Sequence, residues 1–303
     1  MARDFRTCRT ARVFRPTLGA IRTSRTYDHR VGQQPVLRDV HVATGVALRY
    51  LEQGDPAGRT ILLLHPWGES LRCFDRLLAL LPTSLRVLAL DQRGHGGADK
   101  PPSGYELASF AADVEAFMDT AGLAAAVLVG SSSGGYVAQQ VALNSPSRVT
   151  GLVLVGSPRS LYGRPPFAEE VERLTDPVDP AWVRKSLTWF PRFHDVPDWY
   201  IEDRVRDGLR LPAHVWRDTL TGLITALVPT DIGTITVPTL IIWGDRDNLL
   251  SGEDERQMAA AIPGSRLVVY QDTGHLVLWE QPDRVATDLT AFVEGLGTTA
   301  PTS

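Results

Sequence analysis

The chain has 303 residues, of which 43% are hydrophobic and 22% charged, with a formal net charge of −4 at neutral pH. This composition excludes a disordered chain, and the slight acidic excess gives no general attraction to nucleic acid or to an anionic membrane. Two cysteines exclude a disulfide-rich scaffold and a cysteine-cluster metal site, and the apolar runs are strand-length, far short of the roughly 18 residues of a membrane helix.

The first thirty residues differ from the rest in charge. They hold eight arginines against two aspartates, a net charge of +6, so the remaining residues carry −10. The segment lacks the apolar run of a secretory signal, and its Arg, Ser and Thr content is similar to that of an organelle transit peptide. We interpret residues 1–34 as a disordered tail, or as the product of a start codon placed too far upstream, in preference to a targeting segment. We expect a cytoplasmic protein.

From Pro35 onward, short apolar strands alternate with helical patterns. Segments 36–42 and 46–52 flank Thr44-Gly45, which predicts a hairpin. Further strands are predicted at 60–65, 85–91, 125–130 and 149–156, and helices at 73–81, 108–120 and 133–143. Near-continuous Val, Leu and Ile runs indicate strands covered on both faces. Their alternation with helices predicts a mainly parallel, doubly wound α/β sheet.

This pattern breaks between about Pro158 and Thr230, a stretch too long for a loop in a compact domain. Helix-like segments lie within it at 166–174, 180–190, 200–209 and 213–227. We therefore predict an inserted helical cap over 158–230 and a core over 35–157 and 231–297. The core is completed by a strand at 238–244, a helix from Glu253, a strand at 266–270 and a helix from Asp283.

One segment carries the pattern of a serine nucleophile. Gly130-Ser131-Ser132-Ser133-Gly134-Gly135 follows a predicted strand, precedes a predicted helix and matches G-x-S-x-G with Ser132 at the centre. A sharp strand-to-helix turn needs small residues two positions to either side of its apex, and Gly130 and Gly134 supply them. Centring the turn on a neighbouring serine fits less well, because one choice places Val129 at a flanking position and the other moves the turn away from the strand end.

A nucleophilic serine needs a base, and the base needs an orienting acid. Asp245 and Asp247 follow the next-to-last predicted strand, and His275 follows the last strand after a short loop. Both loops begin at the carboxyl ends of strands, where open α/β sheets place their sites. We predict His275 as the base of Ser132. Asp247 is its predicted acid and Asp245 the competitor.

Over about residues 36 to 297 the chain resembles the α/β-hydrolase fold superfamily, and within it the serine esterases and lactonases with a helical cap. The matching motifs, in the family's order, are HPWG at 65–68, DQRGHG at 91–96, the serine turn, GDRD at 244–247, and Gly274-His275 followed by Glu280 and Pro282. The resemblance implies Asp247 as the acid. It also implies the backbone N–H of Trp67 as an oxyanion donor, beside the N–H of Ser133 at the predicted helix N-terminus.

The chain departs from the family at two positions. Pro66 stands where the family usually has glycine; proline lacks an N–H, but the donor is the next residue, so we expect a stiffer loop that keeps the donor. Ala98 replaces a frequent serine, which we expect to affect loop hydrogen bonding only. The remaining polar side chains of these two motifs are interpreted as loop scaffold: His65, Asp91, Arg93 and His95.

Serine at the centre of the turn suits acyl transfer, whereas dehalogenases and epoxide hydrolases of the similar fold use aspartate there. We predict a hydrolase that cleaves carboxylic esters or lactones of small, apolar or aromatic substrates through an acyl-enzyme on Ser132. This chemistry requires neither metal nor organic cofactor. The expected partner is a small-molecule substrate, with no nucleic acid and no membrane. The oligomeric state stays open.

The predicted cap is rich in aromatic residues, including four of the seven tryptophans. We expect most of these rings to form the cap's own core and its contact with the main domain, and one or two to face the substrate. The predicted pocket residues are Trp67, Trp189, Trp216 and Leu276.

Several alternatives stay open. Similar Ser/His/Asp sets serve carbon–carbon bond hydrolases, cofactor-free haloperoxidases (perhydrolases) and aminopeptidases of this fold. An aminopeptidase would need cap carboxylates for a free amine, and we interpret the candidates Glu169, Glu170 and Glu172 as a solvated helix face instead. An alternative from a different functional class is a ligand receptor that hydrolyses its ligand slowly. The complete set of Ser132, Asp247 and His275 argues against this alternative.

Overall fold

The computed structural model describes residues 35–163 and 165–297, and the segment 1–34 that we interpret as a tail lies outside them. Within this part, eight strands form one sheet in the order β1-β2-β4-β3-β5-β6-β7-β8. Strand β2 pairs antiparallel with β1 and β4, and the other pairings are parallel, which confirms the predicted doubly wound sheet. The strands are β1 Val36–His41, β2 Ala47–Gly54, β3 Thr60–Leu64, β4 Arg86–Asp91, β5 Ala126–Ser131, β6 Val149–Val155, β7 Thr239–Gly244 and β8 Arg266–Tyr270.

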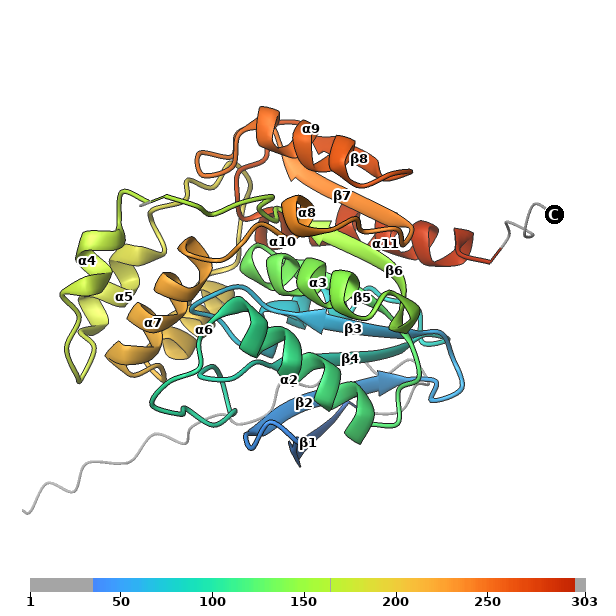
Figure 1. Ribbon diagram of the computed structural model, residues 1–303. Helices are drawn as coiled ribbons and strands as arrows, with labels where there is room; N and C mark the ends of the chain where they lie inside the picture. Colours follow the sequence, from blue (N-terminus) through green and yellow to red (C-terminus); the bar gives the residue numbers. More distant parts are fainter. Residues whose placement is uncertain (1–34, 164, 298–303) are drawn as a thin grey trace, which may run out of the picture. The chain divides into compact units, whose positions relative to one another are not determined.

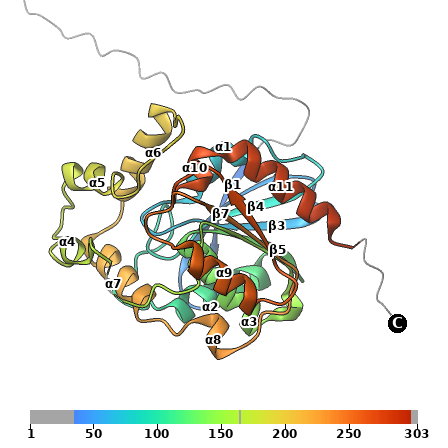
Figure 2. The ribbon, with the colours of Figure 1, turned by 90° about the horizontal axis from the view of Figure 1, so that it is seen from above.

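Helices cover both faces of the sheet (Figure 2). One face packs against α2 (Leu107–Thr120), α3 (Ser133–Asn144) and α9 (Gly252–Ala261). The opposite face packs against α1 (Asp75–Leu78), α10 (Val277–Glu280) and α11 (Pro282–Gly295). No helix in the described ranges is both long and apolar enough to cross a membrane.

Two hydrophobic cores lie on the two faces of the sheet. Leu62 and Leu64 of β3 belong to the core under α2 and α3, while Ile61 and Leu63 belong to the core under α1 and α11. Successive side chains of a strand point to opposite faces, so a strand buried on both faces must be apolar at every position. This explains why the central strands appear in the sequence as continuous apolar runs.

Five helices lie between β6 and β7: α4 Ala168–Glu172, α5 Pro180–Ser186, α6 Asp198–Gly208, α7 Ala213–Ile224 and α8 Pro229–Ile232. Figure 1 shows α4 to α7 beyond the end of the sheet toward which β3 and β7 point. We call residues 156–238 the insert. The predicted helices within it correspond to α4 to α7. The exact boundary between cap and core stays a prediction.

The insert is joined to the core by buried contacts of α6. The Tyr200 hydroxyl donates to the carbonyl of Cys73 at 2.6 Å, and its ring packs edge-on against Trp279, with 5.5 Å between centroids. Arg204 lies over the same ring at 4.7 Å and pairs with Asp207 at 2.7 Å, both side chains being almost fully buried. Tyr200 therefore belongs to the contact between insert and core, as we expected for most of the insert's aromatic residues.

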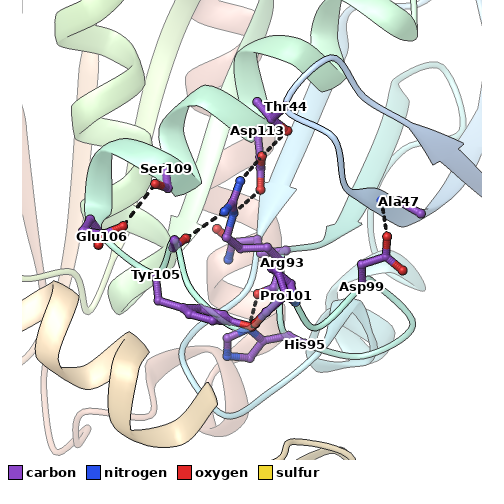
Figure 3. A network of polar contacts seen from close by, with 12 residues as sticks. Thr44, Ala47, Arg93, His95, Asp99, Pro101, Tyr105, Glu106, Ser109 and Asp113 are labelled. Atoms are coloured by element: carbon purple, nitrogen blue, oxygen red, sulfur yellow. Dashed lines mark hydrogen bonds and ion pairs between the residues drawn. The ribbon is translucent and has the colours of Figure 1, made fainter. Parts of the chain in front are cut away.

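The loop after β4 is held by an ion pair with α2 (Figure 3). Nε and Nη2 of Arg93 donate to the two carboxylate oxygens of Asp113 at 2.5 and 2.6 Å, and Nη1 donates to the carbonyl of Gly104 at 2.8 Å. The Thr44 hydroxyl donates to the same carboxylate at 2.5 Å. Arg93 is thus part of the loop scaffold, and this bidentate, buried pair fixes the loop in one conformation.

The structure differs from the sequence-based expectation in its short helices. The helix expected at 73–81 is a 3-10 turn over Leu71–Phe74 followed by α1, which ends at Leu78. The turn starts early because the Ser70 side chain accepts from the N–H of Arg72 at 3.2 Å. Pro82 also disfavours helical backbone at Leu81, the last residue of the expected helix. The four-residue helices α8 and α10 are too short to produce a periodic pattern.

Candidate active site

Ser132 lies on a strained turn between β5 and α3. Its backbone has φ 48° and ψ −122°, a conformation that residues with a side chain rarely adopt. The turn is fixed by the N–H of Ser132, which donates to the carbonyl of Val155 on the neighbouring strand at 2.9 Å. Such strain at a single polar residue is typical of a functional site.

The flanking glycines are required by space. A Cβ on Gly130 would lie 2.3 Å from the backbone nitrogen of Gly135, and a Cβ on Gly134 would lie 2.2 Å from the carbonyl oxygen of Leu64. Only glycine fits at either position. The turn is therefore centred on Ser132.

The structure brings Ser132, His275 and Asp247 together from three loops. The Ser132 hydroxyl lies 3.1 Å from Nε2 of His275, and Nδ1 of the same ring lies 2.8 Å from Oδ2 of Asp247. The side chains of His275 and Asp247 are 3% and 0% exposed, so water does not compete for their contact. A carboxylate can only accept, so Nδ1 carries the proton and Nε2 is free to accept from the serine.

Asp247 is itself held in place by hydrogen bonds from the backbone. Its second oxygen, Oδ1, accepts hydrogen bonds from the N–H groups of Leu249 and Leu250 at 2.8 and 2.9 Å. Asp245, the competing acid, instead lies 3.4 Å from the N–H of Thr273 through its Oδ1. The carboxylate that contacts the imidazole is thus that of Asp247.

This arrangement can activate a serine. A neutral imidazole with its lone pair on the serine hydroxyl can take the hydroxyl proton, and the carboxylate behind it stabilises the resulting cation. No group of three His, Cys, Asp or Glu side chains gathers to hold a metal ion in the described ranges.

The backbone N–H of Trp67 has a partner of its own. It donates to Oγ of Ser133 at 2.7 Å, so the side chain next to the candidate nucleophile stands in front of the predicted oxyanion donor. The loop that carries Trp67 is joined to the loop after β4: His65 is fully buried, and its Nε2 accepts from the N–H of Gln92 at 3.0 Å. Burial holds the pKa of His65 well below its usual range, so its ring is neutral and serves as scaffold.

A cavity of about 480 Å³ opens beside Ser132 and His275. Its wall is mostly apolar, as in small-molecule sites. The four residues predicted for the pocket all line it: Trp67, Trp189, Trp216 and Leu276. Residues of the insert and of the core thus meet around one space.

Five aromatic rings near the cavity contact one another in a closed cycle. Trp67 stacks on Phe167 (6.0 Å between centroids), Phe167 on Trp189 (4.4 Å), and Trp182 meets Trp189 edge-on (5.6 Å). Trp216 closes the cycle with edge-on contacts to Trp182 and Trp67 at 5.2 and 5.0 Å. Rings locked in this way present a stiff apolar wall with a shape set by packing.

The insert also touches the candidate base. The ring of Phe190 lies 4.7 Å from that of His275, measured between centroids. The carboxylate of Glu280, itself buried, accepts hydrogen bonds from backbone N–H groups on both sides of this contact, on the histidine loop and on the insert. The position of His275 therefore depends on the insert as well as on the sheet.

Two features near the cavity were missed by sequence reasoning. Phe167 and Phe190 follow no pattern that separates wall residues from the insert's core. Glu69 also lines the cavity; it accepts from Nε1 of Trp279 at 3.2 Å and lies 3.9 Å from Arg204. Burial raises the pKa of Glu69 to about 8. Arg204 comes from a helix so rich in charge that it looks solvent-exposed in the sequence.

The predicted solvated face of the insert is observed. Glu169 pairs with Arg173, and Glu170 accepts from Lys185 at 2.9 Å, all on exposed side chains. These carboxylates do not line the cavity. These glutamates are therefore not placed to bind the free amine of an aminopeptidase substrate beside Ser132.

A family model described as "Alpha/beta hydrolase family" matches residues 61–289. This match spans more than half of the chain, and the chain belongs to the α/β-hydrolase family. The matched segment begins in β3 and ends in α11, so it includes Ser132, Asp247 and His275.

Individual relatives are distant and carry different activities in their names. The chain is 28% identical over 274 residues to a non-heme haloperoxidase of Rhodococcus erythropolis, covering 84% of this chain and 98% of the relative. It is 26% identical over 271 residues to lipase 1 of Psychrobacter immobilis, covering 84% and 83%. The enol-lactonase from Burkholderia xenovorans superposes with a TM-score of 0.74 at 22% identity, covering 85% of this chain and all of that one, a likeness of fold.

Proposed function

We propose that this α/β-hydrolase is a serine hydrolase that cleaves carboxylic esters or lactones. The observation that carries the proposal is the contact of the Ser132 hydroxyl with Nε2 of His275 at 3.1 Å, while Asp247 holds Nδ1 at 2.8 Å. A serine in this setting is a nucleophile for acyl carbon.

In the first half of the reaction, Nε2 of His275 removes the proton of Ser132 as Oγ attacks the substrate carbonyl. The carbonyl oxygen gains the negative charge and is stabilised at the N-terminus of α3, where the first helical N–H is that of Ser133. His275 then gives its proton to the leaving alkoxide. The alcohol departs and an acyl group remains on Oγ.

In the second half, water takes the place of the alcohol. Nε2 of His275 removes a proton from the water, whose oxygen attacks the acyl carbon, and the collapse of the intermediate returns the proton to Ser132. The acid product leaves. A lactone follows the same two steps, except that the leaving alkoxide stays attached to the acyl chain until deacylation.

The cavity favours small substrates with apolar or aromatic parts. Its volume of about 480 Å³ fits a small molecule, and the ring of Trp67 stands beside the predicted oxyanion donor. The stacked rings of Phe167 and Trp189 add a flat surface to the same wall. An aryl or short alkyl group on either side of the ester would bury its surface there.

The predicted cytoplasmic location of the protein remains part of this proposal.

The test is turnover of p-nitrophenyl esters of increasing acyl length together with phenyl-substituted lactones. We expect hydrolysis of short and aromatic esters, a burst of p-nitrophenol equal to the enzyme concentration, and loss of both in Ser132→Ala. A folded protein that turns over none of these substrates would reject the ester and lactone proposal.

A second candidate is perhydrolysis, favoured by the haloperoxidase named among the relatives. Hydrogen peroxide would replace water in deacylation: its oxygen attacks the acyl carbon, His275 takes its proton, and a peroxy acid leaves in place of the acid. The peroxy acid would oxidise halide in solution. Peroxide-dependent bromination of monochlorodimedone in acetate buffer, absent in Ser132→Ala, would support this candidate. Ester hydrolysis without any bromination would reject perhydrolysis and keep the hydrolase proposal.

A further inference from the structure

The hydrogen bond between Trp67 and Ser133 alters how an oxyanion can be held. The N–H of Trp67 points at Oγ of Ser133, 2.7 Å away. One N–H has one hydrogen, and sharing it with a second acceptor weakens both bonds. A substrate oxygen would therefore have to compete with Oγ of Ser133 for this donor.

The Ser133 hydroxyl has a proton to offer in exchange. A hydroxyl accepts through its lone pairs and donates once, and Oγ of Ser133 accepts from Trp67 while no described residue accepts its proton. Ser133 lines the same cavity as Ser132 and His275. An N–H that donates to a hydroxyl also polarises it, so that its own O–H becomes a better donor.

We propose that the Ser133 hydroxyl is itself an oxyanion donor. The carbonyl oxygen of the attacked substrate would receive two hydrogen bonds from one residue, the backbone N–H and the Oγ–H of Ser133, while the N–H of Trp67 holds Oγ in place. Ser133 would then be a catalytic residue, and Trp67 would act through it. The inference rests on the proposed function, because the oxyanion exists only if Ser132 attacks a carbonyl.

A competing direction exists for the same proton. Ser133 also lines a second cavity of about 10 Å³ with His95, Gln92 and Thr219. Nε2 of His95 is buried there and has no partner in the part of the chain that the structure describes. Because Nδ1 of this ring donates to the carbonyl of Arg93 at 2.8 Å, Nε2 is an acceptor. If the Ser133 hydroxyl donated its proton only to an acceptor in this second cavity, such as Nε2 of His95, the hydroxyl would be structural. Its loss would then leave the rate of the chemical step unchanged.

The experiment compares variants that each delete one serine hydroxyl. In Ser133→Ala we expect kcat on p-nitrophenyl acetate to fall about 100-fold, the loss typical of one oxyanion donor, with KM within about 3-fold of wild type. Ser133→Thr keeps a hydroxyl and should restore most of kcat. Ser84→Ala removes the hydroxyl of an exposed serine that does not line the cavity, so it is the control and should behave like wild type.

A second readout separates an oxyanion donor from a structural role. An aryl trifluoromethyl ketone adds to Ser132 and places an oxyanion at the site, whereas the matching aryl alcohol binds without one. Ser133→Ala should weaken the ketone about 100-fold and the alcohol hardly at all. If Ser133→Ala does not fold, Ser133→Cys, which keeps the volume and has only a weak S–H donor, serves in its place.

The outcomes are separable. Wild-type kcat and ketone affinity in a folded Ser133→Ala, beside an inactive Ser132→Ala, would overturn the role of Ser133 and leave the proposed function standing. A wild-type protein that neither turns over esters nor binds the ketone would overturn both. A loss of kcat in Ser133→Ala that Ser133→Thr does not restore would overturn the assignment to the hydroxyl.

Discussion

Oε1 of Glu280 accepts a hydrogen bond from the N–H of Gly274, the residue before His275, at 3.0 Å. Oε2 of the same carboxylate accepts from the N–H groups of Phe193 and His194 in the insert, at 2.7 and 3.0 Å. Glu280 is buried, so these bonds are not shared with water. One side chain thereby joins the loop of the candidate base to the insert that covers it.

The first prediction concerns this link. Glu280→Gln loses one acceptor oxygen and places an NH₂ group against a backbone N–H, so one side of the link must break. We expect kcat to fall about 10-fold while KM changes less, because His275 is displaced from its contact with Ser132 by a small distance. Steady-state kinetics on one ester tests this, with a crystal structure of the variant to locate His275.

Glu294→Gln is the control for Glu280, because Glu294 lies exposed on α11. It should leave both constants unchanged. Wild-type kcat in Glu280→Gln, or a loss as large in Glu294→Gln, would refute a positioning role for Glu280.

The second prediction separates the two aspartates after β7. In Asp247→Asn the amide can present an N–H to His275, which favours the wrong tautomer, and we expect kcat to fall by about 10⁴ without loss of fold. Asp245→Asn should change kcat by less than about 3-fold, because Asp245 contacts Thr273 and not the imidazole. Equal losses in the two variants, at equal thermal stability, would remove Asp247 from its assigned role.

The third prediction concerns the aromatic wall. Phe167 stacks between Trp67 and Trp189, so Phe167→Ala opens the ring cycle and removes flat apolar surface. We expect KM for a phenyl ester to rise about 10-fold, and KM for an acetate ester to change little, since a contact of this size is worth about 1 to 2 kcal/mol. Phe292→Ala removes a half-buried ring from α11, remote from the cavity, and should not alter this selectivity.

The fourth prediction concerns stability and pH. Glu255 of α9 is fully buried, and neither of its oxygens has a hydrogen-bond partner among the described residues. Burial, reinforced by the charge of Asp247, raises the pKa of Glu255 to about 9. The folded state keeps the proton and the unfolded state releases it above its ordinary pKa, so this residue lowers the free energy of unfolding as pH rises through the window between these two pKa values.

Glu255→Gln removes that titration. We expect the variant to be more stable than wild type at pH 8, by about 1 to 3 kcal/mol, with a smaller difference at pH 5. Urea unfolding at both pH values measures this. Glu253→Gln, an exposed change on the same helix, should leave the pH dependence of wild type intact. A gain that is equal at both pH values would contradict the assignment to Glu255.

Much of this architecture could be predicted because local and global signals agree. The central strands are apolar at every position since both faces are buried, and β8 lies at 266–270, the segment predicted for it. Ser132 could be identified as the centre of the turn because only glycine fits at positions 130 and 134, and both glycines are visible in the sequence. Asp247 and His275 could be placed because they follow strands whose carboxyl ends meet at one edge of the sheet.

Other features depend on tertiary contacts that leave no local pattern. The partner of the Trp67 N–H is a side chain 66 positions away in the sequence. Arg204 is buried although its helix is strongly charged, because Asp207 and the ring of Tyr200 surround it. The packing of Phe190 against His275 depends on how the insert folds back over the sheet, and residue spacing alone does not determine that path.

The central claim is that Ser132 is the nucleophile. Its most direct test is the intact mass of the protein after reaction with a phosphonofluoridate, followed by peptide mapping, with Ser132→Ala alongside. We predict one adduct per chain, located on Ser132 and absent from Ser132→Ala. An adduct that persists in Ser132→Ala, or a wild-type protein that hydrolyses esters yet stays unmodified by the reagent, would contradict the account.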